Sequence, residues 1–306
     1  MKTRSSKISK SGVKVRRKPQ IFTYTLLTLC SLCALLPILL VVIISFSTQE
    51  SIRENGYSFF PTEWSLEGWK YVTKFSSQLI QSYQVTILET VLATVLTLIV
   101  SGMFAYVLSR RDFMLRKVLV LYMLVAMLTA GGMISYYLVN TTLYHLKDNF
   151  LVLILPGCMN IGNTIIMRTY IQSNIPDSLI ESGYMDGAGE LTIFWKIVLP
   201  LMKPSVASLA FMVAVGHWNQ WQTSMLYIDD PKLAPLQLLL QRIEADLTFV
   251  TQAERMTPEL LAMLNNMPED PARMAILLTT LGPVLIIYPF FQKHFTKGMT
   301  VGSVKG

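Results

Sequence analysis

The chain has little charge and few of the residues that build catalytic centres. Of its 306 residues, 15% are charged and 52% are hydrophobic, whereas a soluble domain carries about 25% charged residues. It has three histidines, none in an HExxH or similar ligand spacing. No GxxxxGK followed by Ser or Thr occurs, so the chain does not build a phosphate-binding loop of its own. These absences argue against a soluble enzyme and against an ATP site within the chain.

Cysteine is also scarce. Cys30 and Cys33 form a CxxC pair, which in a soluble chain would indicate redox chemistry or zinc. Both lie in an apolar run without polar ligands nearby, so we interpret them as small apolar residues that face lipid or a neighbouring helix. We therefore expect no metal and no cofactor on this chain.

Long apolar runs dominate what remains, and they indicate a membrane protein. Six runs approach the ~20 residues that cross the hydrocarbon of a bilayer, namely 21–46, 85–108, 118–139, 150–167, 205–225 and 272–291. The net charge of +7 does not indicate a nucleic-acid surface, because the basic residues lie at the ends of these runs and in the tails. The sequence therefore predicts an all-α membrane protein with six transmembrane helices.

The distribution of charge predicts the orientation of these spans. The turn at 109–117 and the C-terminal tail are rich in bases, whereas the loop at 220–270 is rich in acids. Six spans with both termini in the cytosol satisfy the positive-inside rule. The predicted order is a basic cytosolic tail (1–20), the first span (21–46), an extracytoplasmic segment (47–84), the second to fifth spans (85–225), an extracytoplasmic loop (226–271), the last span (272–291) and a cytosolic tail (292–306).

One polar segment interrupts the apolar pattern. The stretch ESGYMDGAGELTIFWKIVLPLMKP occupies residues 181–204, within a predicted cytosolic region at 177–200. Gly187 offers a stop to one short helix, and a second helix carries Leu191, Phe194, Trp195 and Val198 at the spacing of one apolar stripe. Its charged residues are mostly acids, which disfavour an anionic membrane surface. We expect the stripe to bind a groove in another protein.

This segment resembles the EAA loop of ABC importer membrane subunits. The matching residues are Glu181, Ser182, Gly183, Asp186, Gly187, Ala188, Phe194, Ile197, Leu199, Pro200 and Pro204. Ser182 and Gly183 replace the two alanines, and Gly183 is expected to weaken its helix. The stretches AYVLSRRDFMLRK, APLQLLLQRI and YPFFQKHFTKGMTVGSVKG resemble the carbohydrate-importing branch, close to the maltose-type second permease and its complex-polysaccharide relatives.

The resemblance implies a type I ABC importer permease in a bacterial cell membrane, a transport subunit rather than an enzyme. The implied partners are an ABC ATPase dimer that carries ATP and Mg, a second homologous permease, an extracytoplasmic solute-binding protein and an oligosaccharide. Glu181 would face a basic residue of the ATPase, and the C-terminal KGMTVGSVKG would also contact it. The implied coupling residues are Glu181, Ser182, Gly183, Asp186, Gly187, Ala188, Phe194, Leu199 and Pro200.

Aromatic rings and amides at membrane depth are candidates for the substrate path, since a sugar presents both C–H faces and hydroxyls. They are Tyr136, Tyr137, Asn140, Asn160, Asn163 and Asn219. For Asn160 and Asn163, lining a path and bridging helices both stay open. Trp218 and Trp221 are interpreted as interfacial anchors. Whether this subunit contacts substrate at all stays open.

Two other functions were weighed. An importer permease for another neutral solute, such as a peptide, keeps the same architecture. An anion is disfavoured, because Arg168 and Arg273 are the only bases near membrane depth and both lie at span ends. An integral membrane enzyme is disfavoured because no cluster of His, Asp and Glu has suitable spacing.

Overall fold

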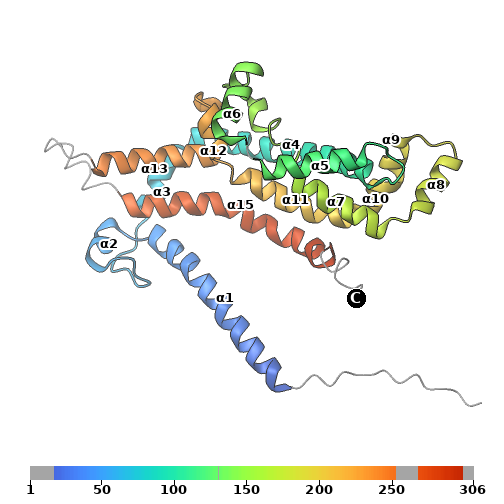
Figure 1. Ribbon diagram of the computed structural model, residues 1–306. Coiled ribbons are helices and arrows are strands. Elements are labelled where there is room, and N and C mark those ends of the chain that lie inside the picture. Colours follow the sequence, from blue (N-terminus) through green and yellow to red (C-terminus); the bar gives the residue numbers. More distant parts are fainter. Residues whose placement is uncertain (1–16, 130, 253–267, 299–306) are drawn as a thin grey trace, which may run out of the picture. The chain divides into compact units, whose positions relative to one another are not determined.

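The computed structural model describes residues 17–129, 131–252 and 268–298 (Figure 1). Within these residues the structure is helical and contains no β-strand. Two compact units are present. The first comprises residues 1–69 with 268–275, and the second comprises residues 70–267 with 276–306.

The first unit contains an apolar helix and a folded segment that follows it. Helix α1 (Arg17–Ser45) presents exposed apolar side chains along most of its length, as a lipid-facing helix does. Helix α2 (Gln49–Asn55) begins at Thr48, whose side chain accepts from the Ser51 N–H. Beyond it, the Tyr57 hydroxyl donates to Asp270 at 2.7 Å. The predicted segment at 47–84 is thus ordered rather than an unstructured loop.

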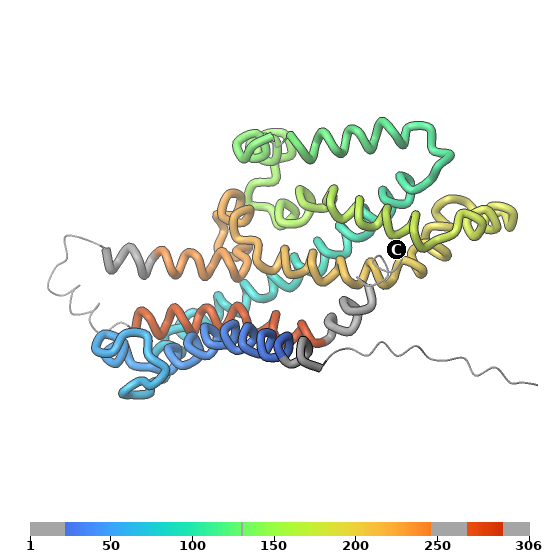
Figure 2. The backbone as a smooth tube through the Cα atoms, turned by 60° about the horizontal axis from the view of Figure 1, so that its bottom comes forward, coloured from blue at the N-terminus to red at the C-terminus, as the bar shows by residue number. Residues whose placement is uncertain are grey.

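The second unit is organised around helix α4 (Ser76–Ser109), which packs against α7 (Ile161–Asn174) and α11 (Lys203–Trp218). Figures 1 and 2 show the three helices side by side. The buried face of α4 is made of small and polar residues, including Thr86, Ala93, Thr97, Ser101 and Ala105. Such residues let helices approach closely in lipid, where burial of apolar surface provides no drive for association.

The remaining helices surround this bundle. They are α3 (Glu67–Thr73), α5 (Arg116–Leu128), α6 (Gly132–Leu138), a π-helix (Val139–Leu143), a 3₁₀ helix (Phe150–Leu153), α8 (Asp177–Met185), α9 (Glu190–Ile193), a π-helix (Phe194–Val198), α10 (Leu199–Leu201), α12 (Gln222–Tyr227), a 3₁₀ helix (Pro231–Leu233), α13 (Leu236–Gln252) and α15 (Glu269–Gly298). In Figure 1, α8 and α9 lie at one end of the bundle and α6 and α12 at the other.

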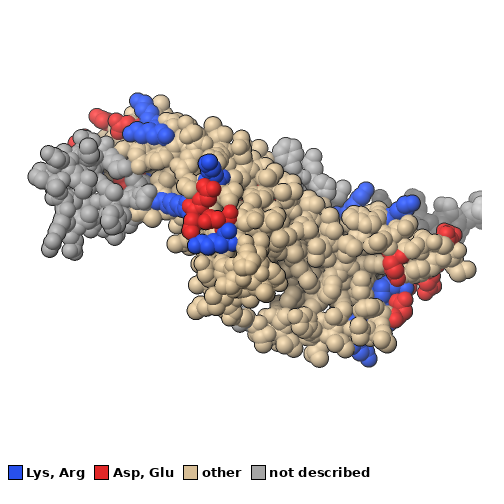
Figure 3. Space-filling view, turned by 90° about the horizontal axis from the view of Figure 1, so that it is seen from above, with Lys and Arg blue, Asp and Glu red and all other residues tan. Residues whose placement is uncertain are grey.

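Several of these helices are long and apolar enough to cross a membrane. Three segments qualify on their own, Phe22–Ser45, Ser76–Ser109 and Glu269–Pro289. Two bent pairs raise the count in the described residues to five, Arg116–Leu128 with Gly132–Leu143 and Glu190–Leu201 with Lys203–Trp218. In Figure 3, charged side chains gather towards the two ends of the visible face, and a broad stretch of other residues separates them. The six-span count and the orientation of the termini stay predictions.

Two predicted spans are not continuous helices. The run at 150–167 holds only a 3₁₀ helix before α7 begins, because Pro156 and Gly157 interrupt it and the Asn160 side chain caps α7 by accepting from the Asn163 N–H at 3.0 Å. The run at 205–225 breaks at Asn219, where α11 ends. In contrast, α15 continues through Pro283 and Pro289.

Candidate functional site

The two short helices predicted around Gly187 are present. We call residues 177–201, which comprise α8, α9, the π-helix and α10, the elbow. Gly187 has φ +76°, a left-handed conformation that suits glycine, and its N–H donates to the Tyr184 carbonyl at 2.9 Å. The Ala188 N–H donates to the Gly183 carbonyl at 2.9 Å. These bonds satisfy carbonyls at the end of α8 and fix the corner.

Gly183 allows the two arms of the elbow to pack together. It is buried, and an added Cβ would lie 3.0 Å from Ile197 Cδ1 and 3.2 Å from Ile193 Cγ1. Ile180 and Ile193 are 2% and 0% exposed beside it. Gly183 was expected to weaken its helix, and the structure shows in addition that it is the contact point between the arms.

We predict that Gly183→Leu opens the elbow. The added side chain meets Ile193 and Ile197, and overpacking of this kind costs about 1–3 kcal/mol. Gly183→Ala is the matched control, because its methyl group needs only a small shift of the flexible end of Ile197. Thermal unfolding of the purified protein should fall clearly for the leucine variant and little for alanine. Equal melting temperatures for the two variants would contradict this packing.

The predicted apolar stripe on the second arm is wrong as a single surface. Leu191 and Trp195 are 62% and 46% exposed, whereas Phe194 and Val198 are 2% and 0% exposed inside the chain's own core. The cause is the π-helix at Phe194–Val198, since its wider turn changes which side chains share a face. The residues offered outward at the elbow are instead Glu181, Ser182, Met185, Asp186 and Gly187.

The second arm also does not end at Pro200. Helix α10 continues to Leu201, and the chain then bends by 81° into α11. Pro200 is tolerated because it stands at the start of α10, and Pro204 likewise stands in the first turn of α11, where a missing N–H removes few helical bonds.

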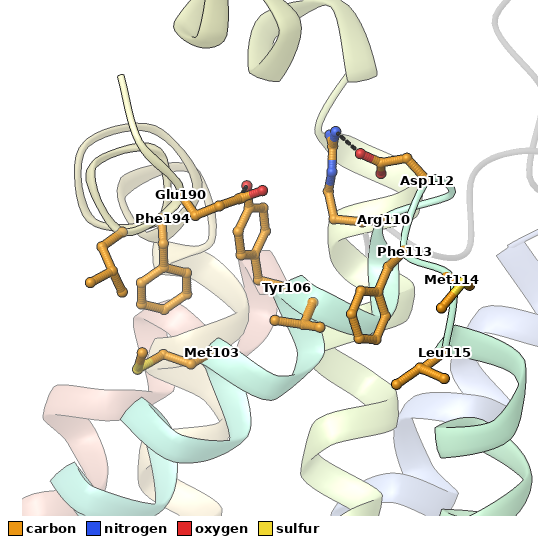
Figure 4. A pocket seen from close by; sticks show the side chains of 11 residues that line it. Met103, Tyr106, Arg110, Asp112, Phe113, Met114, Leu115, Glu190 and Phe194 are labelled. Atoms are coloured by element: carbon orange, nitrogen blue, oxygen red, sulfur yellow. Dashed lines mark hydrogen bonds and ion pairs between the residues drawn. The ribbon is translucent and has the colours of Figure 1, made fainter. Parts of the chain in front are cut away.

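A hydrogen-bonded network joins the elbow to the long helix α4. Tyr106, near the end of α4, donates its hydroxyl hydrogen to Glu190 Oε2 at 2.7 Å. Tyr184 of α8 donates to the other carboxylate oxygen of Glu190. Figure 4 shows the Tyr106 side chain directed towards Glu190, with Phe194 beside it. One carboxylate of α9 therefore ties α4 to both arms of the elbow.

Arg110 completes this end of the bundle. Its guanidinium lies 5.4 Å from the centre of the Tyr184 ring and 3.1 Å from an oxygen of Asp112. The hydrogen bond from Arg110 lowers the pKa of the Asp112 carboxyl. Burial, and then the bond to Glu190, raise the pKa of the Tyr184 phenol. Tyr184 thus stays protonated at neutral pH and remains a donor.

The network borders an apolar cavity of about 480 Å³ between the end of α4, the turn after it and α9 (Figure 4). Its apolar walls come from Met103, Phe113, Met114, Leu115 and Leu191. Since apolar side chains surround the ionic groups, motion of α9 relative to α4 must carry the Glu190 bonds with it or break them.

The structure brings together two of the candidate path residues. Asn160 and Asn163 line a cavity of about 270 Å³ with Thr97, His217 and Gln220. Asn160 also caps α7, so this side chain has a structural role as well. Their role in a substrate path stays a prediction.

The other candidates lie elsewhere. Asn140 is 4% exposed and donates to the Tyr136 carbonyl at 2.9 Å and the Tyr227 hydroxyl at 3.2 Å, while Tyr137 stacks on Tyr227. Asn219 donates to the Val215 carbonyl at the end of α11. In this structure Asn140 bridges helices and Asn219 caps one.

Trp218 is not an interfacial anchor in this structure. It is 6% exposed, and its indole N–H donates to the Thr280 carbonyl at 3.2 Å. The ring therefore packs within the protein, where its N–H needs a partner.

The sequence analysis missed two residues, Glu89 and His217. Glu89 lies on α4 and is fully buried, and His217 Nδ1 lies 4.0 Å from its Oε1. A signal was available, since a carboxylate inside a predicted span is costly unless it serves a purpose.

Taken together, the apolar helices, the buried polar face of α4 and the projecting elbow define a multi-pass membrane permease. The chain belongs to the family described as binding-protein-dependent transport system inner membrane component, whose model matches residues 110–301. It is accordingly a multi-pass protein of the inner membrane and a transport subunit rather than an enzyme.

Several relatives are similar over most of their length. The Bacillus subtilis polygalacturonan/rhamnogalacturonan transport system permease protein YtcP is 39% identical, over 87% of this chain and 91% of its own. The B. subtilis protein LplC is 38% identical, over 87% and 88%. A crystal structure of a bacterial ABC transporter that imports the acidic polysaccharide alginate contains a chain with a TM-score of 0.77 and 29% identity, covering 95% of this chain and 100% of that one.

Proposed function

We propose that this chain is a permease subunit of an ATP-driven, binding-protein-dependent importer of oligosaccharides. Its family membership supports binding-protein-dependent transport. The relatives are named for saccharides: polygalacturonan and rhamnogalacturonan for YtcP, and arabinooligosaccharides for the AraQ permease of B. subtilis, which is 30% identical over 70% of this chain. These names favour an oligosaccharide over a peptide.

The elbow is the coupling element in this proposal. A separate ATPase dimer binds ATP and Mg and grips the exposed outer side of the elbow, with Glu181 opposite a basic residue. Met185 supports this, since it is 87% exposed beside Glu181 at the tip of α8. Gly183, Ala188, Phe194 and Leu199 contribute from the inner side, where they belong to the packed core of the elbow or border it.

The other partners are a second, homologous permease and an extracytoplasmic solute-binding protein. Exposed apolar side chains on α5, such as Leu121, Tyr122 and Val125, are available to lipid or to the second permease. The proposed tail contact to the ATPase falls largely on residues 299–306, which lie outside the described residues.

The observation that carries the proposal is an acidic, exposed elbow in a chain of this transport family. The test is co-purification with the ATPase and second permease, followed by oligosaccharide uptake in proteoliposomes. Glu181→Lys reverses the charge that faces the ATPase, so we expect association to be lost and uptake to fall at least tenfold, about 1.4 kcal/mol. Glu50→Lys, an exposed acid on α2, is the control and should be silent. Normal association and uptake for Glu181→Lys would overturn the proposal.

A further inference from the structure

The strongest unexplained feature of the second unit is the carboxylate of Glu89. The side chain is fully buried in the middle of the bundle, and neither carboxylate oxygen has a hydrogen-bond partner. Buried polar groups are nearly always bonded, because an unpaired one costs free energy in an apolar interior. Inside a membrane span this cost is larger, so the residue needs a function or a partner.

His217 is the ionisable group beside it. Its Nδ1 lies 4.0 Å from Glu89 Oε1 and also lacks a hydrogen-bond partner. The imidazole is 9% exposed, and the surface that it keeps lines the cavity of about 270 Å³. His217 therefore connects a buried carboxylate to a space that a ligand can enter.

The cavity itself is polar and carries no other charged group. Besides His217, its polar lining consists of Thr97, Asn160, Asn163 and Gln220. Amide and hydroxyl groups are hydrogen-bonding partners for uncharged polar ligands. A ligand with several hydroxyls matches this lining better than one with a fixed charge.

We infer that Glu89 and His217 form a dyad that binds a hydroxyl group of the transported saccharide. This inference rests on the proposed function. With one proton shared between them, the pair has no net charge, and Nδ1 is occupied by the carboxyl group whichever of the two holds the proton. Nε2 then carries a hydrogen in both arrangements and is the donor offered to the ligand. Glu89 is a positioning residue, and His217 is the residue that touches the sugar.

The separation of 4.0 Å suits this assignment. Hydrogen bonds of binding sites are often long in the absence of ligand and shorten when it binds. Gly157 permits the approach, because a Cβ there would already lie 3.6 Å from His217 Cε1.

The test uses the complete transporter in proteoliposomes, with ATPase, second permease and binding protein. The probes are labelled arabinotriose, maltotriose and trigalacturonate, and the one that wild type imports fastest is carried forward. Two quantities are measured: uptake at saturating binding protein, and the saccharide retained by the vanadate-trapped complex. His217→Gln and Glu89→Gln should each lower both about tenfold, the size of one lost hydrogen bond to ligand.

Ser101→Ala is the matched control, because Ser101 is also buried on α4 with an unbonded hydroxyl but does not line the cavity. It should leave both quantities unchanged. Retention equal to wild type in both dyad variants overturns the inference, while import by wild type leaves the proposed function intact. Failure of wild type to import or retain any of the three probes overturns both.

A second measurement needs no substitution and decides the matter if a variant does not assemble. Monodeoxy analogues of the chosen saccharide are compared with the parent sugar on the wild-type transporter. At least one analogue should be retained about tenfold less, since a site that bonds a hydroxyl rejects the analogue that lacks it. Equal retention of every analogue would show that no hydroxyl is read there.

Discussion

Replacing Gly187 with proline should abolish uptake while the helical bundle still folds. Gly187 has φ +76° and donates its N–H to Tyr184. Proline fixes φ near −65° and has no N–H, so it cannot form this corner, a loss of about 3 kcal/mol or more. No atom lies within 4 Å of a Cβ at this position, so the damage stays local to the corner.

Uptake and co-purification with the ATPase measure the effect, and two controls separate it from general sensitivity of the loop. Gly189 has an ordinary backbone conformation and open space around it, so Gly189→Ala should be silent. Gly187→Asn should keep most activity, because asparagine tolerates a left-handed conformation. Wild-type uptake by Gly187→Pro would mean that the geometry of the corner does not matter.

Replacing Glu190 with glutamine should separate ATP hydrolysis from transport. Glu190 accepts from both Tyr106 and Tyr184, so one carboxylate joins α4 to both arms of the elbow. An amide presents two hydrogens towards donors and cannot accept both bonds as a carboxylate does. The ATPase should still bind the outer side of the elbow, yet its movement should no longer reach α4.

We expect saccharide imported per ATP hydrolysed to fall at least tenfold, about 1.4 kcal/mol. Tyr106→Phe should have a similar effect, and the double variant should be no worse than either single one, because both remove the same connection. Lys196→Gln, an exposed charge on the same arm, is the control. Fully additive losses, or normal coupling in both single variants, would contradict a shared network.

Local signals predicted the elbow well. Gly187 marked the corner because its special backbone conformation is a property of one residue, and the order of short helix, corner and second helix followed from neighbouring residues. The periodicity of the second arm misled, because a π-helix changes which side chains share a face and leaves no simple mark in sequence.

The interior of the bundle was harder to predict. Glu89 and His217 lie far apart in the chain, and only the packing of α4 against α11 brings them together. Asn140 and Asn160 looked alike in the sequence, yet one is fixed by Tyr227 and the other lines a cavity. Which partner an amide finds is a property of tertiary contacts, and composition alone does not determine it.

Cross-linking from the tip of the elbow tests the central claim most directly. Met185 is 87% exposed there, so Met185→Cys can be introduced after Cys30, Cys33 and Cys158 are replaced by serine. With the assembled complex, a short bifunctional reagent should join this cysteine to the ATPase subunit, and vanadate trapping should change the yield. A cysteine that never cross-links to the ATPase, and reacts with a water-soluble maleimide equally with and without that subunit, would contradict the account.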